Sequence, residues 1–179
     1  MAENADTSAS AVSSGDGSLP LAAPDGSTAS NGGWQGRVDF YILEGPSSSA
    51  RLKLACKLAE KAYLASQSVL VWDRDSTELR AFDEMLWTFN DGSFVPHELL
   101  SNSGALGEAP VLLSSGVAPS ANVDIIINLD ADLPSCLSRT RRVAEIIDGD
   151  DVRRRAGRAR FKAYRELGVE PTSHNIHVD

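Results

Sequence analysis

The patterned part of the chain begins with short, continuous apolar runs of the kind that form strands buried on both faces of a sheet. The clearest runs are VDFYIL at 38–43, SVLVWD at 68–73 and VDIIINL at 123–129. Two shorter runs, at 109–115 and 143–147, predict further strands. Because strands buried on both faces need helices on both sides, these runs indicate an α/β protein with a mostly parallel sheet.

Two segments with apolar residues at helical spacing predict helices over 50–66 and 77–89. Ser76 is expected to cap the second helix by accepting hydrogen bonds from its first amides. The apolar faces of the two helices are predicted from residues three or four positions apart, namely Leu54, Leu58, Ala62 and Ala65, then Leu79, Phe82, Leu86 and Phe89. A turn and loop over 90–100 and a short helix near 134–137 complete the prediction. The order strand, helix, strand, helix is typical of a single α/β domain.

The two ends of the chain lack such patterns. Residues 1–36 contain no Lys or Arg and are built mainly from Ala, Ser, Gly, Asp and Pro. They carry too little apolar surface to offset the entropy of ordering, so we expect a disordered extension. We expect the folded domain over 37–172 and a flexible tail over 173–179. His174 and His177 lie in that tail without a Cys or Glu pair to complete a metal site, so we expect them to be solvated.

The composition narrows the classes of protein. The chain has 179 residues, enough for one domain, and a formal net charge of −8. An acidic chain of this kind is unlike a protein that coats nucleic acid broadly. No apolar stretch reaches the roughly 18 residues that a membrane span needs, so we expect no membrane partner. Cys56 and Cys136 form no C-x-x-C pair, so we expect two buried, reduced cysteines in a cytoplasmic protein.

Candidate catalytic and cofactor motifs are incomplete. The first strand is followed by EGPSSS at 44–49, which lacks the second Gly and the Lys of a phosphate-binding loop, and Pro46 removes an amide donor. His97 is expected to be a structural hydrogen-bond partner, because no nucleophile motif accompanies it. Three acidic residues around the strand at 123–129 could hold magnesium, but without a phosphate loop we expect solvated loop acids at Asp124, Asp130 and Asp132. The sequence therefore predicts no catalytic site, no metal and no cofactor.

The last predicted helix concentrates positive charge. It begins after a cap at Asp150 or Asp151 and ends at Leu167, with Gly168 as the stop. Its positive side chains are Arg153, Arg154, Arg155, Arg158, Arg160, Lys162 and Arg165. The face expected to pack on the sheet carries Ala156, Ala159, Ala163 and Leu167. A second stripe is cationic with one aromatic ring and consists of Arg154, Arg158, Phe161 and Arg165.

Three interpretations of this basic helix stay open on the residues alone. It can be an ordinary solvated face, a direct contact for single-stranded nucleic acid, or a site for an acidic ligand. Arg predominates over Lys, and its planar guanidinium suits carboxylate and phosphate recognition. Phe161 adds apolar surface among the charges, which suits a ligand with acidic and apolar parts. Direct binding of single strands would need more stacking rings than Phe161 and Tyr164.

Two segments carry a resemblance to a known family. RARFKAYRELG at 158–168 resembles the C-terminal helix of the chi subunit of bacterial DNA polymerase III, where the pattern R-x-R-[YF]-K-x-Y-[RK]-x-x-G recurs. LWTFNDGSFVPHEL at 86–99 resembles the LW…SF[VI]PH segment of the same family. The resemblance covers about 37–168. It implies an α/β fold related to mononucleotide-binding folds but lacking a nucleotide site, and an accessory subunit that is not itself an enzyme.

The resemblance also implies partners. Chi links the clamp loader, through the psi subunit, to single-stranded-DNA-binding protein, whose acidic C-terminal tail it binds. DNA would then be contacted indirectly, through that protein. The residues implied for the tail are Arg154, Arg158, Phe161, Lys162, Tyr164 and Gly168, with Phe161 standing where the family usually has Tyr. The residues implied for psi are Trp87, Phe94, Val95 and Pro96.

Overall fold

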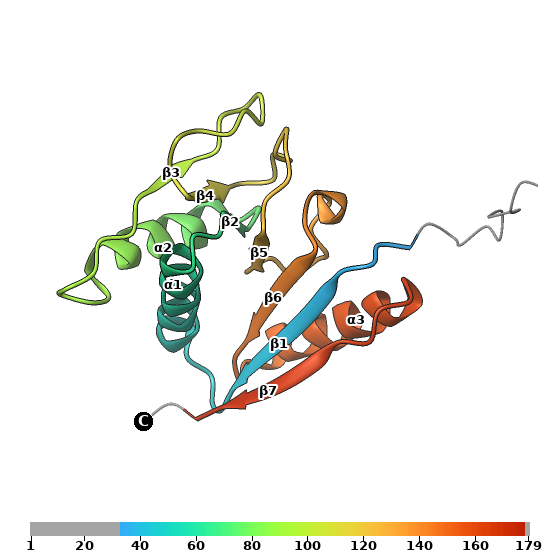
Figure 1. Ribbon diagram of the computed structural model, residues 1–179. Coiled ribbons are helices and arrows are strands. Elements are labelled where there is room, and N and C mark those ends of the chain that lie inside the picture. The colour runs from blue at the N-terminus through green and yellow to red at the C-terminus, as the bar shows by residue number, and fades with distance from the viewer. Residues whose placement is uncertain (1–32, 178–179) are drawn as a thin grey trace, which may run out of the picture. The chain divides into compact units, whose positions relative to one another are not determined.

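The structure, a computed structural model, describes residues 33–177, and these form one seven-stranded sheet flanked by helices (Figure 1). Every strand pair is parallel, in the order β3-β4-β2-β5-β6-β1-β7. The strands are β1 (Arg37–Leu43), β2 (Val69–Trp72), β3 (His97–Leu99), β4 (Val111–Ser114), β5 (Ile125–Asn128), β6 (Arg142–Ile147) and β7 (Thr172–Ile176). The α/β fold with a parallel sheet that the sequence predicts is confirmed.

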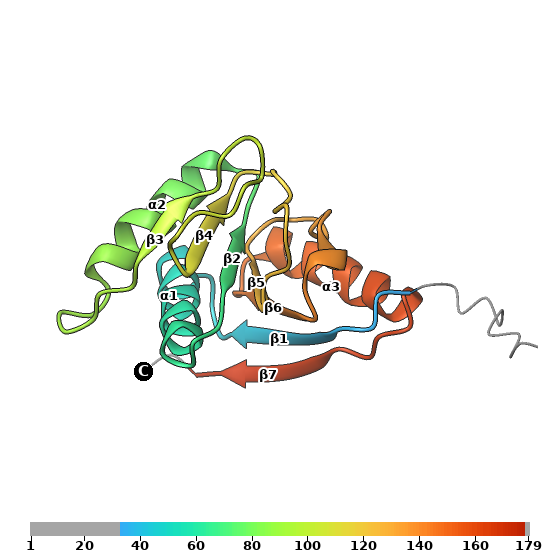
Figure 2. The ribbon, with the colours of Figure 1, turned by 45° about the horizontal axis from the view of Figure 1, so that its top comes forward.

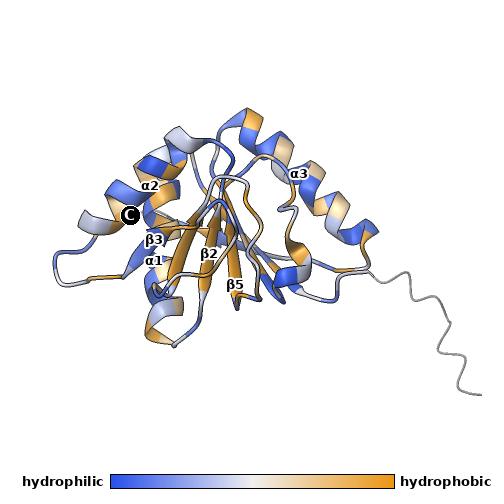
Figure 3. Cartoon of the chain, turned by 90° about the horizontal axis from the view of Figure 1, so that it is seen from above, coloured by the Kyte–Doolittle hydropathy of each residue, from blue (hydrophilic) through white to orange (hydrophobic). Residues whose placement is uncertain are grey.

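Helices cover both faces of the sheet. The α-helices are α1 (Ser48–Leu64), α2 (Ser76–Thr88) and α3 (Asp151–Glu166), and a short 3-10 helix spans Leu137–Arg139. Figures 2 and 3 show α1 and α2 together on one face and α3 alone on the other. The strands alternate their side chains between these two layers, so that Val71 packs beneath α1 and α2 while Leu70 faces the opposite layer.

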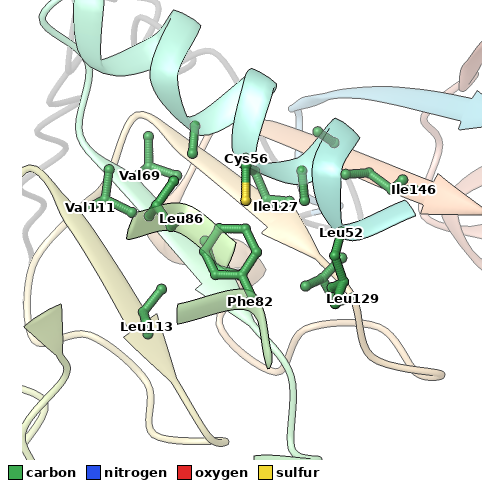
Figure 4. Close-up of a cluster of buried hydrophobic side chains, with 14 of the residues drawn as sticks. Leu52, Cys56, Val69, Phe82, Leu86, Val111, Leu113, Ile127, Leu129 and Ile146 are labelled. Atoms are coloured by element: carbon green, nitrogen blue, oxygen red, sulfur yellow. The ribbon is translucent and has the colours of Figure 1, made fainter. Parts of the chain in front are cut away.

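The larger apolar core lies between the sheet and the helices α1 and α2 (Figure 4). Phe82 of α2 is fully buried at its centre, against strand residues such as Leu113 and Ile127. Cys56 belongs to this core and Cys136 to the core on the other face, and both are unpaired and buried. Burial raises the pKa of the Cys56 thiol to about 12, so it remains a neutral, apolar group. The prediction that both cysteines are buried is confirmed.

The predicted face and cap of the first two helices need correction. Leu54 and Leu58 are only half-buried and Ala65 is exposed. The face of α1 that meets the sheet consists of Arg51, Leu52, Ala55, Cys56, Ala59 and Ala62. Its small side chains allow the helix to lie close to the strands. For α2, Asp75 is the cap and Ser76 is the first helical residue, because the Asp75 carboxylate accepts from the amide of Thr77 at 2.9 Å.

Two edge strands were missed by the sequence pattern. β3 lies in the segment predicted as a loop, and β7 occupies most of the predicted flexible tail. β7 pairs with β1, and its polar sequence TSHNI reflects an edge position where solvent replaces one neighbouring strand. At the other end, the Trp34 indole donates to the carbonyl of Thr140 at 2.7 Å, so the predicted extension ends before this residue. The rest of that extension, residues 1–32, lies outside the described residues.

A buried carboxylate joins α3 to the sheet. Glu145 of β6 is fully buried and receives the Arg160 guanidinium, with Nε at 2.9 Å, and the Tyr164 hydroxyl at 2.8 Å. The side-chain amide of Asn128 donates to the same carboxylate at 3.0 Å. Burial and the adjacent Glu145 carboxylate raise the pKa of the Tyr164 hydroxyl, which therefore stays protonated and donating. Such a charge is tolerated inside the fold only because these partners saturate it.

Because of this network, the face of α3 that packs inward differs from the predicted one. The expected alanine face is wrong, because Ala159 and Leu167 are exposed. The buried residues are instead Gly157, Arg160 and Tyr164. The remaining boundaries hold: Asp150 caps the helix by accepting from the Arg153 amide at 2.9 Å, and Gly168 follows the helix with a φ of 87°.

A second buried cation lies at the carboxyl ends of the central strands. The Arg51 guanidinium donates to the carbonyls of Leu129 and Ile146 and pairs with Glu78. The neighbouring Asp73 side chain is 3% exposed, and one of its oxygens has no hydrogen-bond partner. Burial raises the pKa of Asp73 to about 7, with the Glu78 carboxylate adding to the effect. Asp73 is therefore an acid that the fold prefers in its neutral form.

Arg160→Met should destabilise the protein strongly, by about 3–5 kcal/mol, because it leaves the Glu145 charge buried without its cation. Arg158→Met is the matched control. It removes an exposed arginine two residues away and should change the free energy of unfolding by no more than about 0.5 kcal/mol. Urea unfolding followed by circular dichroism measures both, and equal effects of the two substitutions would contradict the role given to Glu145.

Asp73→Asn should stabilise the protein more at high pH than at low pH. With a native pKa of about 7 and an unfolded value of about 4, Asp73 contributes stability below about pH 4 that is lost as the pH rises through about 7. The Asn side chain keeps the oxygen that accepts from the Asp75 amide at 2.8 Å and never ionises. The expected result is a larger increase in the thermal unfolding midpoint at about pH 8 than at about pH 5. An increase that does not depend on pH would refute the assignment.

Candidate functional site

A hollow of about 320 Å³ opens beside α3, on the face of the sheet opposite α1 and α2. Its floor is apolar and consists of Phe40 and Ile42 of β1 with Ile147 of β6. Phe161 forms one wall and packs on Phe40, with their ring centroids 5.2 Å apart. Arg154 and Arg158 line the hollow from the exposed side of α3. An apolar pocket edged by two guanidiniums can hold a ligand with an apolar group and an acid.

Gly157 lies where α3 passes close to β6. A Cβ atom at this position would lie 2.1 Å from Cδ1 of Ile147, so another residue here would require the end of the Ile147 side chain to move. The two arginines that flank the hollow stand one residue after and three residues before this glycine. The close approach therefore brings both of them near the apolar floor.

The positive charge of the hollow is not neutralised by other side chains among the described residues. Neither Arg154 nor Arg158 forms an ion pair within residues 33–177. A shallower hollow next to it is lined by Arg158, Phe161, Lys162, Arg165 and Glu166. Lys162 meets Glu166 only at 3.9 Å, and both side chains are largely exposed. Four of the six residues predicted for the acidic tail, Arg154, Arg158, Phe161 and Lys162, thus lie together.

The other two predicted residues lie elsewhere. Tyr164 is fully buried and its hydroxyl is committed to Glu145, so it supports α3 and has no surface to offer a ligand. Gly168 follows the end of the helix, roughly 15 Å along the axis from Arg158, and its φ of 87° gives it a structural role as the helix stop. Both residues belong to the framework that presents the hollow.

A second candidate surface lies on the opposite face, around the end of α2. The exposed fractions are 54% for Trp87 and 62% for Phe94, and the two ring centroids are 5.4 Å apart. His97 supports the pair: its ring centroid lies 4.7 Å from that of Trp87, and its Nδ1 is 2.7 Å from the Val95 carbonyl. The expected structural role of His97 is confirmed by these contacts. Leu99, on the edge strand β3, adds a further exposed apolar side chain.

The remaining predicted residues of this surface differ from each other. Val95 is 1% exposed and belongs to the core beneath α1 and α2, so its side chain cannot contact a partner. Pro96 is half-buried beside it. The segment thus presents the Phe94 ring to solvent, while the adjacent Val95 is buried and fixes the backbone on the core.

The turn after β1, where a nucleotide-binding fold would hold a phosphate, is contacted by a carboxylate from another loop of the protein. Asp148 of the loop after β6 accepts from the Ser47 amide at 3.0 Å, at the start of α1. Arg153 donates to the same carboxylate, with Nε and Nη2 both at 2.7 Å. Burial opposes ionisation of Asp148, but Arg153 and the amides outweigh it and hold the pKa below its usual value. An anionic group of the protein thus occupies the N-terminus of α1.

The three acids on either side of β5 are only partly the solvated loop acids that the sequence predicts. Asp132 is exposed, but Asp130 is 5% exposed and pairs with Arg74 through two hydrogen bonds of 2.7 Å. Burial disfavours the charged form, yet these bonds prevail and lower the pKa of Asp130 to about 2. Asp124 accepts from the amide of Ser68 at 2.7 Å and ties β5 to the start of β2. These carboxylates are structural.

Sequence reasoning missed the floor of the α3 hollow. The sequence identifies Phe40, Ile42 and Ile147 only as strand residues. Alternation along β1 places Phe40 and Ile42 on one face of the sheet, but it does not predict a hollow there. Gly157 offered a usable signal, because a glycine inside a helix of otherwise strong formers usually marks a close approach.

Comparison of the sequence with known proteins identifies a matching family and several relatives. The sequence profile of the family described as "DNA polymerase III chi subunit, HolC" matches residues 36–172. The DNA polymerase III subunit chi of Pseudomonas aeruginosa is 36% identical over 140 residues, covering 78% of this chain and 96% of that protein. The Escherichia coli subunit chi is 30% identical over 134 residues, covering 72% of this chain and 90% of that protein.

One structural neighbour agrees with the fold. The crystal structure of T4 UvsW superposes with a TM-score of 0.59 at 11% identity, over 80% of this chain and 42% of that one, which shows likeness of fold alone. Within the described residues, none of the helices combines the length and apolar character that crossing a bilayer requires. The profile match and the two relatives show that this chain belongs to the chi subunit family of DNA polymerase III, an accessory subunit in DNA replication.

Proposed function

We propose that this protein is a non-catalytic adaptor that links the clamp loader, through psi, to the acidic C-terminal tail of single-stranded-DNA-binding protein. The observation that carries the proposal is the α3 hollow, in which two arginines without an ion pair among residues 33–177 lie beside an apolar floor. In this adaptor role, DNA is contacted through the second partner. Both cysteines are buried and unpaired, which suits work in a reducing cytoplasm.

The hollow suits a peptide that ends in an aromatic residue and a free carboxylate. Phe40, Ile42 and Ile147 offer the ring an apolar floor, and Phe161 offers it a flanking ring. Arg158 can pair with the terminal carboxylate through its planar guanidinium. Acidic residues upstream would meet Arg154 and Lys162, which are exposed and screened by salt.

The exposed rings of Trp87 and Phe94 support the proposal that psi binds on the other face. Large aromatic side chains at a surface are typical anchors of protein interfaces. Because the sheet separates this pair from α3, both partners can bind at the same time, as an adaptor requires.

Direct binding of single-stranded DNA along α3 is less well supported. Such binding needs several rings on which bases can stack. Tyr164 is buried, so Phe161 is the one aromatic side chain that the described part of α3 presents beside its arginines.

Arg158→Ala should weaken binding of an acidic peptide with a C-terminal Phe by ~2 kcal/mol, or roughly 30-fold, because it removes the partner of the terminal carboxylate. Fluorescence anisotropy of the labelled peptide, titrated with wild type and variant, measures the change. Arg155→Ala is the charge-matched control, since Arg155 is exposed on α3 but does not line the hollow.

A peptide with an amidated C-terminus tests the same contact from the ligand side. It should bind wild type about as weakly as the free acid binds the Arg158 variant, and Arg158→Ala should then have little further effect. Equal affinity of Arg158→Ala and Arg155→Ala for the free-acid peptide would show that the hollow is not the site.

Replacing both Trp87 and Phe94 by Ser should abolish co-purification with psi, because the pair supplies the exposed apolar surface. Val152→Ser is the control, since Val152 is 69% exposed on α3, which lies on the opposite face of the sheet. The double variant should bind the acidic peptide like wild type. Undiminished co-purification with psi would refute this surface.

A further inference from the structure

Another surface of the described chain is basic and aromatic without belonging to either site above. It lies on the α1 side of the strands β6, β1 and β7. α3 covers the opposite side of β1 and β7. On this side α1 packs over β6, and much of β1 and β7 is left open among residues 33–177 (Figure 1). The strand register places Arg37, Asp39, Tyr41 and Leu43 of β1 in one row, flanked by Arg142 of β6 and by His174 and Ile176 of β7. We call this surface the β1–β7 strip.

At one end the strip opens into a groove of about 410 Å³ between α1 and the strands. Lys53 and Lys57 line it from α1, one helical turn apart, while Ile176 and His177 line it from the β7 side. Both lysines are exposed, and neither forms an ion pair within the described residues. Their charges are therefore available to a ligand in the groove.

The middle of the strip carries two stacked rings. The ring centroids of Tyr41 and His174 are 5.1 Å apart and their planes differ by 23°. Both side chains are partly exposed, and His174 is held by the Asp39 carboxylate at 3.0 Å. Paired rings on neighbouring strands of an open sheet face are a form of platform on which nucleobases stack.

The far end of the strip carries two arginines that a single buried acid positions. Asp39 is fully buried and meets Arg37 at 2.9 Å and Arg142 at 3.4 Å. The Arg37 side chain is 63% exposed, and that of Arg142 is 34% exposed. One carboxylate thus holds two guanidiniums whose outer edges still face solvent.

The charge of the strip opposes that of the whole molecule. Arg37, Arg142, Lys53 and Lys57 face two carboxylates, the buried Asp39 and Glu44, which pairs with His177 at 3.1 Å. The chain as a whole has a formal net charge of −8. A local excess of cations that runs past two rings, from Leu43 to Arg37 over roughly 20 Å of strand, suits a flexible polyanion with flat groups.

We propose that the β1–β7 strip binds single-stranded DNA directly, with phosphates on the basic residues at its two ends and bases against the Tyr41–His174 pair. This activity is separate from the adaptor role, because the strip lies across the sheet from the α3 hollow and includes neither Trp87 nor Phe94. It also requires no other protein. The chain would then contact the strand itself beside the protein that coats it.

The test is fluorescence anisotropy of a labelled oligothymidylate of about 16 nucleotides with the full-length protein over a series of salt concentrations. The double variant Lys53→Ala/Lys57→Ala should bind at least tenfold more weakly at low salt. The slope of log affinity against log salt should become shallower by about 1.4, because each lost phosphate contact accounts for about 0.7. Arg80→Ala/Arg155→Ala is the charge-matched control, since both arginines are exposed and lie outside the strip.

A pair of substitutions at Tyr41 tests stacking separately from charge. Tyr41→Phe keeps the ring and should bind like wild type, whereas Tyr41→Leu should bind about tenfold more weakly with an unchanged salt slope. Thermal unfolding shows whether the half-buried Leu variant folds, and if it does not, the lysine pair still decides. Failure of wild type to bind at low salt, or equal weakening by the arginine control, would overturn the proposal. Binding of an acidic peptide that the lysine substitutions abolish, without binding of the oligonucleotide, would overturn it in favour of a peptide site.

Discussion

The fully buried carboxylate of Glu145 is the constraint on which the α3 face depends. A charge at that depth is stable only when its lone pairs are filled, and it receives donors from Arg160, Tyr164 and Asn128. Two of these donors come from α3, one turn apart. They fix both the position of the helix along β6 and its rotation about its own axis, so the direction of every other side chain on α3 follows from this contact.

The arginines of α3 consequently fall into two groups with different roles. Arg153 and Arg160 turn inward and neutralise the buried acids Asp148 and Glu145. Arg154 and Arg158 turn outward, flank an apolar floor and form no ion pair in the described part of the chain. The inward pair stabilises the fold through ion pairs, whereas the charges of the outward pair face solvent. A run of basic residues that looks uniform in the sequence is therefore partly framework and partly surface.

The parallel sheet separates the surfaces that an adaptor needs. The α3 hollow lies on one face, whereas the rings of Trp87 and Phe94 and the β1–β7 strip lie on the other. At the carboxyl ends of the central strands, Arg51 donates to the Ile146 carbonyl and lines a hollow of about 360 Å³, and the Asp148 carboxylate occupies the start of α1. The start of α1 is thus taken up by an internal ion pair, and the proposed partner surfaces lie on the outer faces of the molecule.

The sequence alone predicts the strands β1, β2, β4, β5 and β6, the three α-helices and the parallel architecture, because buried strands and amphipathic helices leave strong local periods. It also placed Arg154, Arg158, Phe161 and Lys162 on one part of α3, since helical spacing brings them together. The three-dimensional fold was needed to show that Tyr164 and Val95 are buried, that Arg160 faces Glu145, and that β7 adds a polar edge strand. These outcomes depend on contacts between residues far apart in the chain, such as Glu145 with Asn128 and Tyr164, which no local period records.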